Sequence, residues 1–176
     1  MFDLRLEFNE VILSSVLKDD LAEVYKWIIK YDNCSEKSCQ LNFNEFCNRF
    51  LEYYLGEGEV FLKISKGKDI IGILKGRLEF KKNNQLWIRY FRTQSKDIVK
   101  GVWDEVIREI LNRLANEMGI NEFYAIVSSE EKEYLEFWRR NGFKLKRLFD
   151  SFDETKNDVK IFIFGKVLAN KYKEIL

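Results

Sequence analysis

The sequence predicts an α/β (α+β) fold in which one mixed sheet holds a central parallel strand pair, with helices on both faces of the sheet. Two observations favour this fold. The most regular helical pattern lies between two strand-like runs, Leu86–Thr93 and Phe123–Val127, and a long helix between two strands of one sheet is a crossover that joins parallel strands. In addition, three strand-like runs that end at Thr93 are separated only by short turns, which is typical of an antiparallel meander.

Residues 2–31 predict one strand followed by one helix. The stretch 2–16 is strand-like, and Val11–Val16 is its most regular part. Asp19 or Asp20 can cap a helix, because a carboxylate accepts hydrogen bonds from the first free backbone N–H groups. The apolar residues that follow recur at helical spacing; they are Leu21, Val24, Tyr25, Ile28 and Ile29.

A polar stretch separates this helix from a second one. Asn42 stands three residues before Glu45, a spacing that resembles a capping box, in which each side chain accepts a hydrogen bond from the other residue's backbone. Gly56 and Gly58 end the helix. Its predicted apolar face consists of Phe43, Phe46, Cys47, Phe50, Leu51 and Tyr54.

Three strands and the strongest helix of the chain follow. Glu59–Ser65 and Ile70–Phe80 predict a hairpin around a short polar turn, and Leu86–Thr93 adds a third strand. The apolar residues of the next helix recur every three or four positions until Gly119 stops it. They are Val102, Trp103, Val106, Ile107, Ile110, Leu111, Leu114 and Met118.

The last third of the chain predicts a buried strand, a helix and a hairpin. Phe123–Val127 is entirely apolar, as expected for a strand buried on both faces. A helix starts at Ser128 and ends at Gly142, and Phe143–Phe149 with Asp158–Leu168 form the final hairpin. The predicted order is β-α-α-β-β-β-α-β-α-β-β, and a length of 176 residues suits one domain over the whole chain.

The composition excludes several kinds of chemistry. The chain has no histidine, so it has no histidine base, no Ser-His or Cys-His nucleophile and no His-ligated zinc. Its net charge of +1 makes no case for binding nucleic acid or an anionic membrane. The three cysteines Cys34, Cys39 and Cys47 contain no CxxC, and we expect free thiols and no metal, the alternative being three thiolates that bind a metal with an outside ligand.

The ends and the hydropathy of the chain predict its location. No run of 18 apolar residues occurs, so no transmembrane helix is expected. The first residues, Met1–Glu10, lack the basic start and apolar core of a signal peptide. We therefore expect a cytoplasmic protein with no membrane partner.

Three stretches, taken with the element order, resemble one known family. The first, residues 98–103, precedes and begins the long helix. The second reads Tyr-Leu-Glu-Phe-Trp-Arg-Arg-Asn-Gly-Phe over residues 134–143, and the third is an apolar strand with an internal glycine, Ile70–Leu74. Together they resemble the GNAT superfamily of N-acetyltransferases, and the resemblance in element order covers nearly the whole chain.

In that family the start of the long helix holds the pyrophosphate of acyl-CoA. The pattern is Arg or Gln, two residues, Gly, one residue, and Gly or Ala, because small residues let backbone N–H groups at a helix N-terminus approach the phosphates. The resemblance assigns cofactor contact to Ile98, Val99, Lys100, Gly101, Val102 and Trp103. Gly101 matches the first glycine, whereas Ile98 and Trp103 depart from the pattern. Lys96 and Lys100 could add positive charge there, while Asp97 and Asp104 would oppose it.

The second stretch would supply the acid of the reaction. In many family members the second of the two adjacent aromatic residues is a tyrosine that protonates the departing CoA thiolate. Trp138 stands at that position, and an indole N–H donates hydrogen bonds but is no proton-transfer acid at neutral pH. Tyr134, one helical turn earlier, is the nearest substitute, and Trp138 either takes part or packs in the core. Arg139 and Arg140 could meet a CoA phosphate or form a solvated helix face.

The resemblance implies an acetyl-CoA-dependent N-acyltransferase. Pantetheine would lie between the two parallel strands and bond to the main chain of Phe91, Arg92 and Thr93, where an N–H would also polarise the thioester carbonyl. An amine would then attack directly with the help of a base or a water chain. Glu79, Glu122 and Asp97 are conceivable bases or solvated surface carboxylates.

Two functions remain open at this point. The first is acetyl transfer from acetyl-CoA to a primary amine of a small molecule, a peptide N-terminus or a lysine. The second is a non-catalytic module of the same fold that binds CoA weakly or not at all and serves in interaction or regulation. No nucleic-acid partner is expected, and the strand-like run Val159–Val167 could pair across a homodimer.

Overall fold

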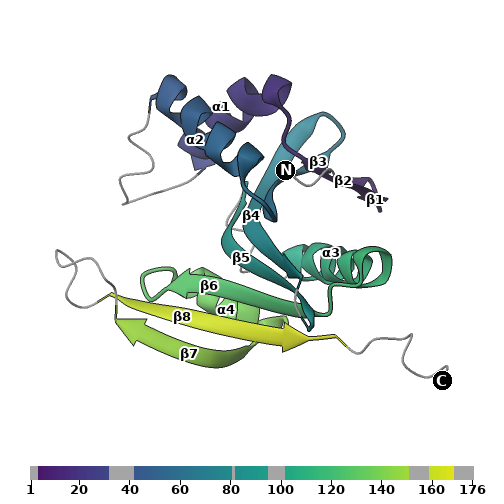
Figure 1. The fold of residues 1–176 in the computed structure, drawn as a ribbon, viewed down its shortest axis with the longest axis vertical. Helices are drawn as coiled ribbons and strands as arrows, with labels where there is room; N and C mark the ends of the chain where they lie inside the picture. The colour runs from purple at the N-terminus through teal and green to yellow at the C-terminus, as the bar shows by residue number, and fades with distance from the viewer. Residues whose placement is uncertain (1–3, 32–41, 81, 95–101, 151–158, 169–176) are drawn as a thin grey trace. The chain divides into compact units, whose positions relative to one another are not determined.

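The computed structural model describes residues 4–31, 42–80, 82–94, 102–150 and 159–168 (Figure 1). Its eight strands form one sheet in the order β1-β2-β3-β4-β5-β6-β8-β7. The predicted α/β fold with a parallel pair is confirmed, because β5 (Asn84–Thr93) pairs in parallel with β6 (Glu122–Ser128). The chain contains two compact units: an N-terminal unit of residues 1–77 and 90–95, and a C-terminal unit of residues 78–89 and 96–176.

The N-terminal unit begins with a hairpin where the sequence predicts a single strand. Strands β1 (Arg5–Phe8) and β2 (Val11–Ser15) pair antiparallel. They are joined by Asn9 and Glu10, whose φ angles are 44° and 64°. Two successive positive φ values are typical of a type I′ hairpin turn, which usually contains glycine. The prediction of one strand over residues 2–16 was wrong because this turn has no glycine to reveal it.

Two helices follow, and the predicted cap is confirmed for the second of them. A short 3₁₀ turn, Lys18–Asp20, leads into α1 (Leu21–Tyr31). The prediction that Asp19 or Asp20 is its N-cap was wrong: Leu17 is the N-cap of the turn, and the Asp20 carboxylate reaches back to accept a 2.8 Å hydrogen bond from the Leu17 N–H. Helix α2 (Phe43–Leu55) starts with the predicted capping box, because the side chains and backbone N–H groups of Asn42 and Glu45 exchange two hydrogen bonds of 3.0 Å.

Strand β3 (Glu59–Lys66) pairs antiparallel with β4 (Asp69–Phe80), and β5 lies next to β4 in the sheet, which confirms the predicted meander. The two helices and these strands bury one apolar cluster in the N-terminal unit. Its buried members are Val16, Leu21, Val24, Trp27, Phe46, Phe50, Phe61, Ile70 and Ile73.

The C-terminal unit contains the predicted crossover and the final hairpin. Its elements are α3 (Val102–Met118), β6, α4 (Lys132–Arg140), β7 (Lys144–Asp150) and β8 (Lys160–Val167). Figure 1 shows β8 running between β6 and β7, and both of its edges are paired within the chain. The expectation that the run Val159–Val167 pairs across a homodimer is therefore wrong, because this strand has no open edge.

Strand β6 is fully buried on only one face. Phe123, Ala125 and Val127 are buried, while the residues between them are half-buried. On the half-buried face the indole of Trp87 stacks on the ring of Tyr124, with centroids 4.3 Å apart. The prediction that β6 is buried on both faces was therefore wrong. Tyr124 is an apolar residue in the sequence pattern, but in the structure it packs on Trp87 and stays half-buried. None of the described helices is long and apolar enough to cross a membrane.

Candidate functional site

The parallel ladder between β5 and β6 stops before either strand ends. Its pairs run from Gln85 with Glu122 to Ile88 with Ala125 among the described residues, while β5 continues to Thr93 and β6 to Ser128. The backbone that the sequence analysis assigns to pantetheine therefore lies past the last pair of the ladder. An added extended ligand bonds to the backbone at a strand edge, and the predicted pantetheine contact lies on this part of β5.

The end of β5 has one buried face and one half-buried face. Phe91 and Thr93 are 3% and 5% exposed, whereas Tyr90 and Arg92, which alternate with them, are half-buried. The Arg92 guanidinium donates a 2.9 Å hydrogen bond to the Phe91 carbonyl. Just past the strand, the N–H of Gln94 donates to the Ile71 carbonyl at 2.7 Å. The three predicted residues of this segment thus lie together on a strand end that is held on its β4 side.

The hydrogen bond to Ile71 depends on a β-bulge. Ile64 of β3 pairs with Gly72, and Ser65 pairs with Ile70, so Ile71 is left without a partner in β3. A bulge re-aims the backbone of the extra residue, and here its carbonyl accepts from the N–H of Gln94. The glycine of the Ile70–Leu74 stretch therefore lies next to a bulge, where a glycine eases the local bend.

Two side chains of α1 form hydrogen bonds near the start of β4 and just past the end of β5. The indole Nε1–H of Trp27 donates to the Ile70 carbonyl at 2.7 Å, and the Gln94 side-chain amide lies 3.1 Å from the Tyr31 hydroxyl. Hydrogen bonds from Lys30 and then Gln94 lower the pKa of Tyr31 below its ordinary value. The sequence analysis missed these contacts, because they join residues that are 43 and 63 positions apart.

An ammonium group lies among four aromatic rings beside this strand end. The Nζ of Lys75, in β4, is 4.3 Å from the ring centroid of Phe61 and 5.1 Å from that of Tyr90. The rings of Phe46 and Tyr53, both from α2, lie 5.8 Å away. The sequence analysis missed this cluster as well. The one available signal was a lysine directly after the apolar run Ile70–Leu74 of β4, since charged side chains are seldom buried without a partner.

A second cation lies over one of the same rings. The guanidinium carbon of Arg92 is 4.8 Å from the ring centroid of Tyr90, and the Lys75 ammonium is 5.1 Å from the same centroid. Both distances lie within the range of cation–π attraction. Two positive charges therefore lie around one half-buried tyrosine, which packs against the apolar cluster of the N-terminal unit.

The predicted phosphate loop is only partly within the described structure. Ile98, Val99, Lys100 and Gly101 lie outside the described residues, and Val102 is the first residue of α3. Trp103 is 5% exposed and belongs to the buried core. The bulky residue at the position where the family pattern has Gly or Ala is therefore part of the buried core.

The first turn of α3 is tied to the last residues of α4. The Asp104 carboxylate accepts hydrogen bonds from Arg140 at 2.7 and 3.0 Å and from the Asn141 amide at 2.8 Å. Burial opposes the ionisation of this carboxyl, but the two partners outweigh it and hold the pKa of Asp104 below its ordinary value. Arg140 is thus a partner of Asp104 rather than a solvated charge, and it offsets the negative charge that Asp104 brings to the helix start.

The residues of the second family-like stretch form a helix end. Trp138 is 2% exposed, and its ring meets those of Phe143 and Phe137 edge-on, with centroids 4.7 and 5.1 Å apart. The N–H of Phe143 donates to the Trp138 carbonyl and the N–H of Gly142 to the Arg139 carbonyl. These bonds, with a φ of 80° at Gly142, are a Schellman motif. The Gly-Phe ending is therefore explained by helix termination and packing alone.

The other two predicted residues of α4 are accessible. Tyr134 is half-buried near the start of the helix, and Arg139 is exposed. The guanidinium carbon of Arg139 lies 5.7 Å from the ring centroid of Phe164. Both side chains can therefore reach a ligand, unlike the indole of Trp138.

The candidate bases lie in different environments. Glu122 accepts hydrogen bonds from the side chains of Asn83, Gln85 and Tyr124, at the amino end of β6 and so at the opposite end from the residues past Ala125. Burial and then the Glu122 carboxylate raise the pKa of Tyr124. Glu79 is half-buried in β4, and Asp97 lies outside the described residues.

Metal ligands are not gathered anywhere in the described part of the chain. No group of three or more Cys, Asp or Glu side chains there could hold a metal ion. Cys47 is a half-buried free thiol of α2, and the other two cysteines lie outside the described residues.

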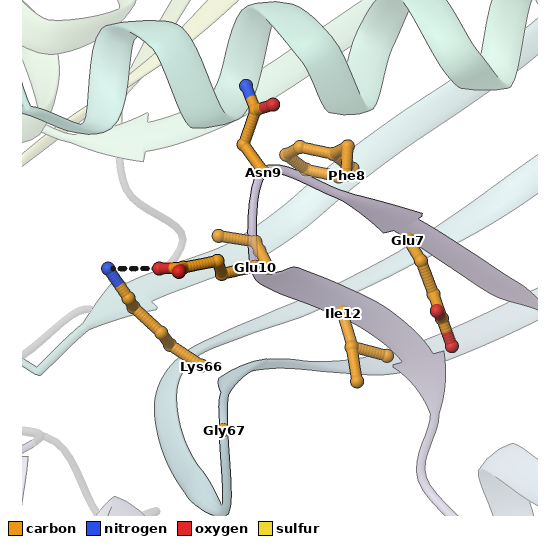
Figure 2. A pocket seen from close by; sticks show the side chains of 8 residues that line it. Glu7, Phe8, Asn9, Glu10, Ile12, Lys66 and Gly67 are labelled. Carbon is orange, nitrogen blue, oxygen red and sulfur yellow. Dashed lines mark ion pairs between the residues drawn. The ribbon is translucent and has the colours of Figure 1, made fainter.

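A hollow at the tips of two hairpins is separate from all predicted site residues. Figure 2 shows it between the β1–β2 turn and the β3–β4 turn, with Glu10 and Lys66 forming a 3.2 Å ion pair at its edge. The side chains of this pair are 79% and 59% exposed, so the charges are largely solvated. The hollow contains none of the groups that acyl transfer would use.

Comparison with known proteins agrees with this arrangement. A family model described as an acetyltransferase (GNAT) domain matches residues 13–159. No curated protein sequence matches the chain significantly. Among solved structures, the ribosomal L7/L12 α-N-protein acetyltransferase in complex with coenzyme A has a TM-score of 0.77 at 13% identity, covering 94% of this chain and 98% of that one.

Two further structures show the same fold. A spermidine N-acetyltransferase chimera from Vibrio cholerae and hSSAT has a TM-score of 0.75 at 13% identity, covering 90% of this chain and 96% of that one. The microcin C7 self-immunity acetyltransferase in complex with acetyl-CoA and AMP has a TM-score of 0.71 at 16% identity, covering 92% and 94%. At such identities the likeness is one of fold. With the family match over residues 13–159, however, the chain belongs to the GNAT acetyltransferase family.

Proposed function

We propose that the protein transfers an acetyl group from acetyl-CoA to a primary amine. The observation that carries this proposal is the family match over residues 13–159. The end of the parallel ladder at Ile88 and Ala125 supports it, because backbone past that point is unused by the neighbouring strand in the ladder. The solved relatives act on a protein N-terminus and on spermidine by their names, so an amine acceptor is the shared chemistry.

The reaction would proceed by direct attack of the amine. Pantetheine would bond to the main chain of Phe91, Arg92 and Thr93, and an N–H there would polarise the thioester carbonyl. The amine nitrogen then attacks the carbonyl carbon, the C–S bond breaks, and the nitrogen loses a proton to water or a carboxylate. Tyr134, which is accessible, or a water would protonate the leaving thiolate. Trp138 can position its neighbours but cannot act as that acid.

The pyrophosphate would be held by the start of α3. Backbone N–H groups of the segment 98–103 would face the phosphates, with Gly101 allowing close approach. Trp103 itself belongs to the buried core, so its contribution to the loop would be its backbone. Arg139, exposed on α4, would add a cation. The pairing of Asp104 with Arg140 and Asn141 reduces the charge that would oppose the phosphates.

Ligand-induced stabilisation and thiol release together test the proposal. Acetyl-CoA should raise the melting temperature by mass action, with about 2.7 kcal/mol gained at a ligand concentration of roughly 100 times Kd. CoA thiol release in the presence of a panel of primary amines should follow. Gly101→Glu should abolish the thermal shift, because it brings bulk and negative charge to the phosphate contact. Lys68→Glu, at an exposed turn in the N-terminal unit, is the control, because it adds negative charge away from the proposed phosphate contact.

The opposite result favours the other function. If millimolar acetyl-CoA leaves the melting temperature unchanged and no amine releases the thiol, the enzyme proposal fails. The chain is then a non-catalytic GNAT-fold module that serves in interaction or regulation. Stabilisation without thiol release for any amine would separate CoA binding from catalysis.

A further inference from the structure

Strand β7 lies at one edge of the sheet and is exposed along its full length. It is the last strand in the sheet order and pairs with β8 along one side. None of the other described strands pairs with its second side. All of its residues, Lys144–Asp150, are exposed. The backbone N–H and C=O groups of such an edge are a template for a further strand, and proteins usually protect them.

Three of the exposed side chains of β7 are large and apolar. Leu145 is 49% exposed, Leu148 is 48% exposed and Phe149 is 39% exposed. Single apolar residues are common on a protein surface, whereas a group of them marks an interaction site. Because Leu148 and Phe149 are adjacent, their side chains lie on opposite faces of the sheet. A partner packed on one face would cover one of them, while a strand added to the edge would contact both.

The features that usually protect an edge do not cover this one. A β-bulge interrupts the pairing with β8 between Leu145 and Arg147, and Lys146 is the extra residue. Bulges and lysines are two of the features that commonly block edge pairing. The Lys146 stem, however, lies over β8, because a Cβ added at Gly165 would be 2.9 Å from its Cγ and 3.0 Å from its Cε. It therefore points away from the open edge, which continues regularly from Arg147 to Asp150.

The order of side chains after the bulge fits a second copy of the same strand. When a two-fold axis relates two antiparallel strands, each contact occurs twice, and directly opposed residues lie on the same face. With the axis at Leu148, this leucine meets the partner's Leu148. Arg147 and Phe149 share the other face, because they pair with Ile163 and Ile161 of β8. Arg147 then meets the partner's Phe149, which places a guanidinium beside an aromatic ring.

The neighbouring registers are less favourable. With the axis at Arg147, two guanidinium groups would be directly opposed, and opposed like charges destabilise a strand pair. With the axis at Phe149, Leu148 would meet the carboxylate of the partner's Asp150. A shift by a single residue would oppose side chains from different faces. The sequence of β7 therefore selects the register with Leu148 at the axis.

We propose that β7 is a dimer interface, at which a second copy of the chain adds its own β7 in antiparallel orientation with the two-fold axis at Leu148. Strand β8 cannot take this role, because both of its edges are paired. Leu148 lies opposite the half-buried Phe162 of β8, so the pairing extends one apolar row across the axis. The contact is short, and the expected Kd of the dimer is about 1–100 µM. The proposal does not depend on acetyl transfer.

Sedimentation velocity of the full-length chain, at concentrations that span this Kd, tests the association. The wild type should shift from monomer to dimer as its concentration rises. Leu148→Asp should raise the Kd by about thirtyfold or more, because it opposes two carboxylates at the axis and alters both copies at once. Leu51→Asp is the matched control, since Leu51, in α2, is 52% exposed. It should leave the Kd unchanged.

A disulfide at the axis tests the register. Directly opposed residues of antiparallel strands have Cα atoms about 4.5 or 5.5 Å apart, which is within the range that a disulfide spans. Leu148→Cys, oxidised with diamide, should therefore give a covalent dimer whose 148–148 link is identified by peptide mass. Leu145→Cys is the control, because the two copies of this equally exposed position would be about 20 Å apart. It should give no 145–145 link.

Each outcome decides for or against the dimer. A concentration-dependent dimer that Leu148→Asp dissolves, together with the 148–148 link, supports it whether or not the protein transfers acetyl groups. A wild type that stays monomeric, a dimer that Leu148→Asp leaves intact, or a 145–145 link in place of the 148–148 link would overturn it. So would a monomer whose β7 binds an acidic extended peptide. If circular dichroism shows that Leu148→Asp is unfolded, the disulfide test decides alone.

Discussion

At the scale of the residue, Asp104 carries a negative charge that the sequence alone predicts to oppose phosphate binding, and the structure gives this charge two partners. It lies in the first turn of α3, where a carboxylate is favoured by the helix dipole but would repel a bound pyrophosphate. Arg140 and Asn141 each reach it from the end of α4. The same contacts join the two helices of the C-terminal unit, so the residue has a measurable structural role that does not depend on any ligand.

We predict that Asp104→Asn lowers the free energy of unfolding by about 1 kcal/mol at pH 7. The side chains of Asp104 and Arg140 are 19% and 36% exposed, so solvent screens part of the interaction and the effect is smaller than for a buried pair. Because the pKa of Asp104 is lowered from its ordinary 3.8, its contribution is present above about pH 4 and is lost as the pH falls further.

Urea denaturation between pH 2.5 and 7 measures this contribution. The wild type and Asp104→Asn should differ at neutral pH and converge at the acid end. Glu7→Gln is the matched control, because the Arg5–Glu7 pair is 63% and 59% exposed and should contribute nothing measurable. A difference that grows as the pH falls would contradict the assigned direction of the pKa shift.

A second residue-scale prediction concerns the indole of Trp27. Trp27→Phe keeps an aromatic ring but leaves the Ile70 carbonyl without its 2.7 Å donor. Since Trp27 is 6% exposed, we expect a loss of about 1–3 kcal/mol in the free energy of unfolding, including a small cavity. Chemical denaturation measures it, and a loss below 0.5 kcal/mol would show that water replaces the donor.

At the scale of the element, helix ends were easier to predict than strand neighbours. The start of α2 follows from Asn42 and Glu45 because a capping box is local in sequence. The β1–β2 turn was missed because Asn9 and Glu10 adopt positive φ without a glycine. The aromatic surroundings of Lys75 come from α2, β3 and β5, and no pattern in one segment predicts which distant rings will meet.

The second stretch that resembles the family also has a local structural explanation. Trp138 and Gly142–Phe143 match the family pattern best within residues 134–143. In the structure they serve packing and helix termination. Their match to the family pattern therefore predicted the fold correctly and says little about catalysis.

Helix α4 offers a direct test of the role of its glycine. Gly142→Ala should lower the free energy of unfolding by about 1 kcal/mol, because a φ of 80° is strained for a residue with a Cβ. An added Cβ would meet only the Lys166 side chain, at 3.8 Å, so the cost is conformational and not steric. Gly142→Asn should cost less, because asparagine tolerates the left-handed region. Equal losses for both variants would indicate that the space at this position, and not the backbone angle, sets the cost.

At the scale of the whole molecule, two strands contribute to both compact units. The N-terminal unit includes Asp69–Arg77 of β4 and Tyr90–Thr93 of β5, and the C-terminal unit includes the remaining parts of both strands. If β4 and β5 separate in one unit, the parts of the same two strands in the other unit lose their support as well. Shared strands of this kind favour a single unfolding transition over two.

We therefore predict that the protein unfolds in urea in one step, although its contacts divide into two units. Trp27 belongs to the N-terminal unit, and the other three tryptophans, Trp87, Trp103 and Trp138, belong to the C-terminal unit. In Trp27→Phe, tryptophan fluorescence reports the C-terminal unit alone, while far-UV circular dichroism reports both. The two signals should give the same midpoint and the same m-value, because two-state unfolding makes all probes coincide. A fluorescence midpoint above that of circular dichroism would mean that the C-terminal unit, with its crossover and final hairpin, holds its structure without the strands that end in the other unit. In that case acetyl-CoA binding should be tested on each transition separately, since a ligand stabilises only the transition that disrupts its site.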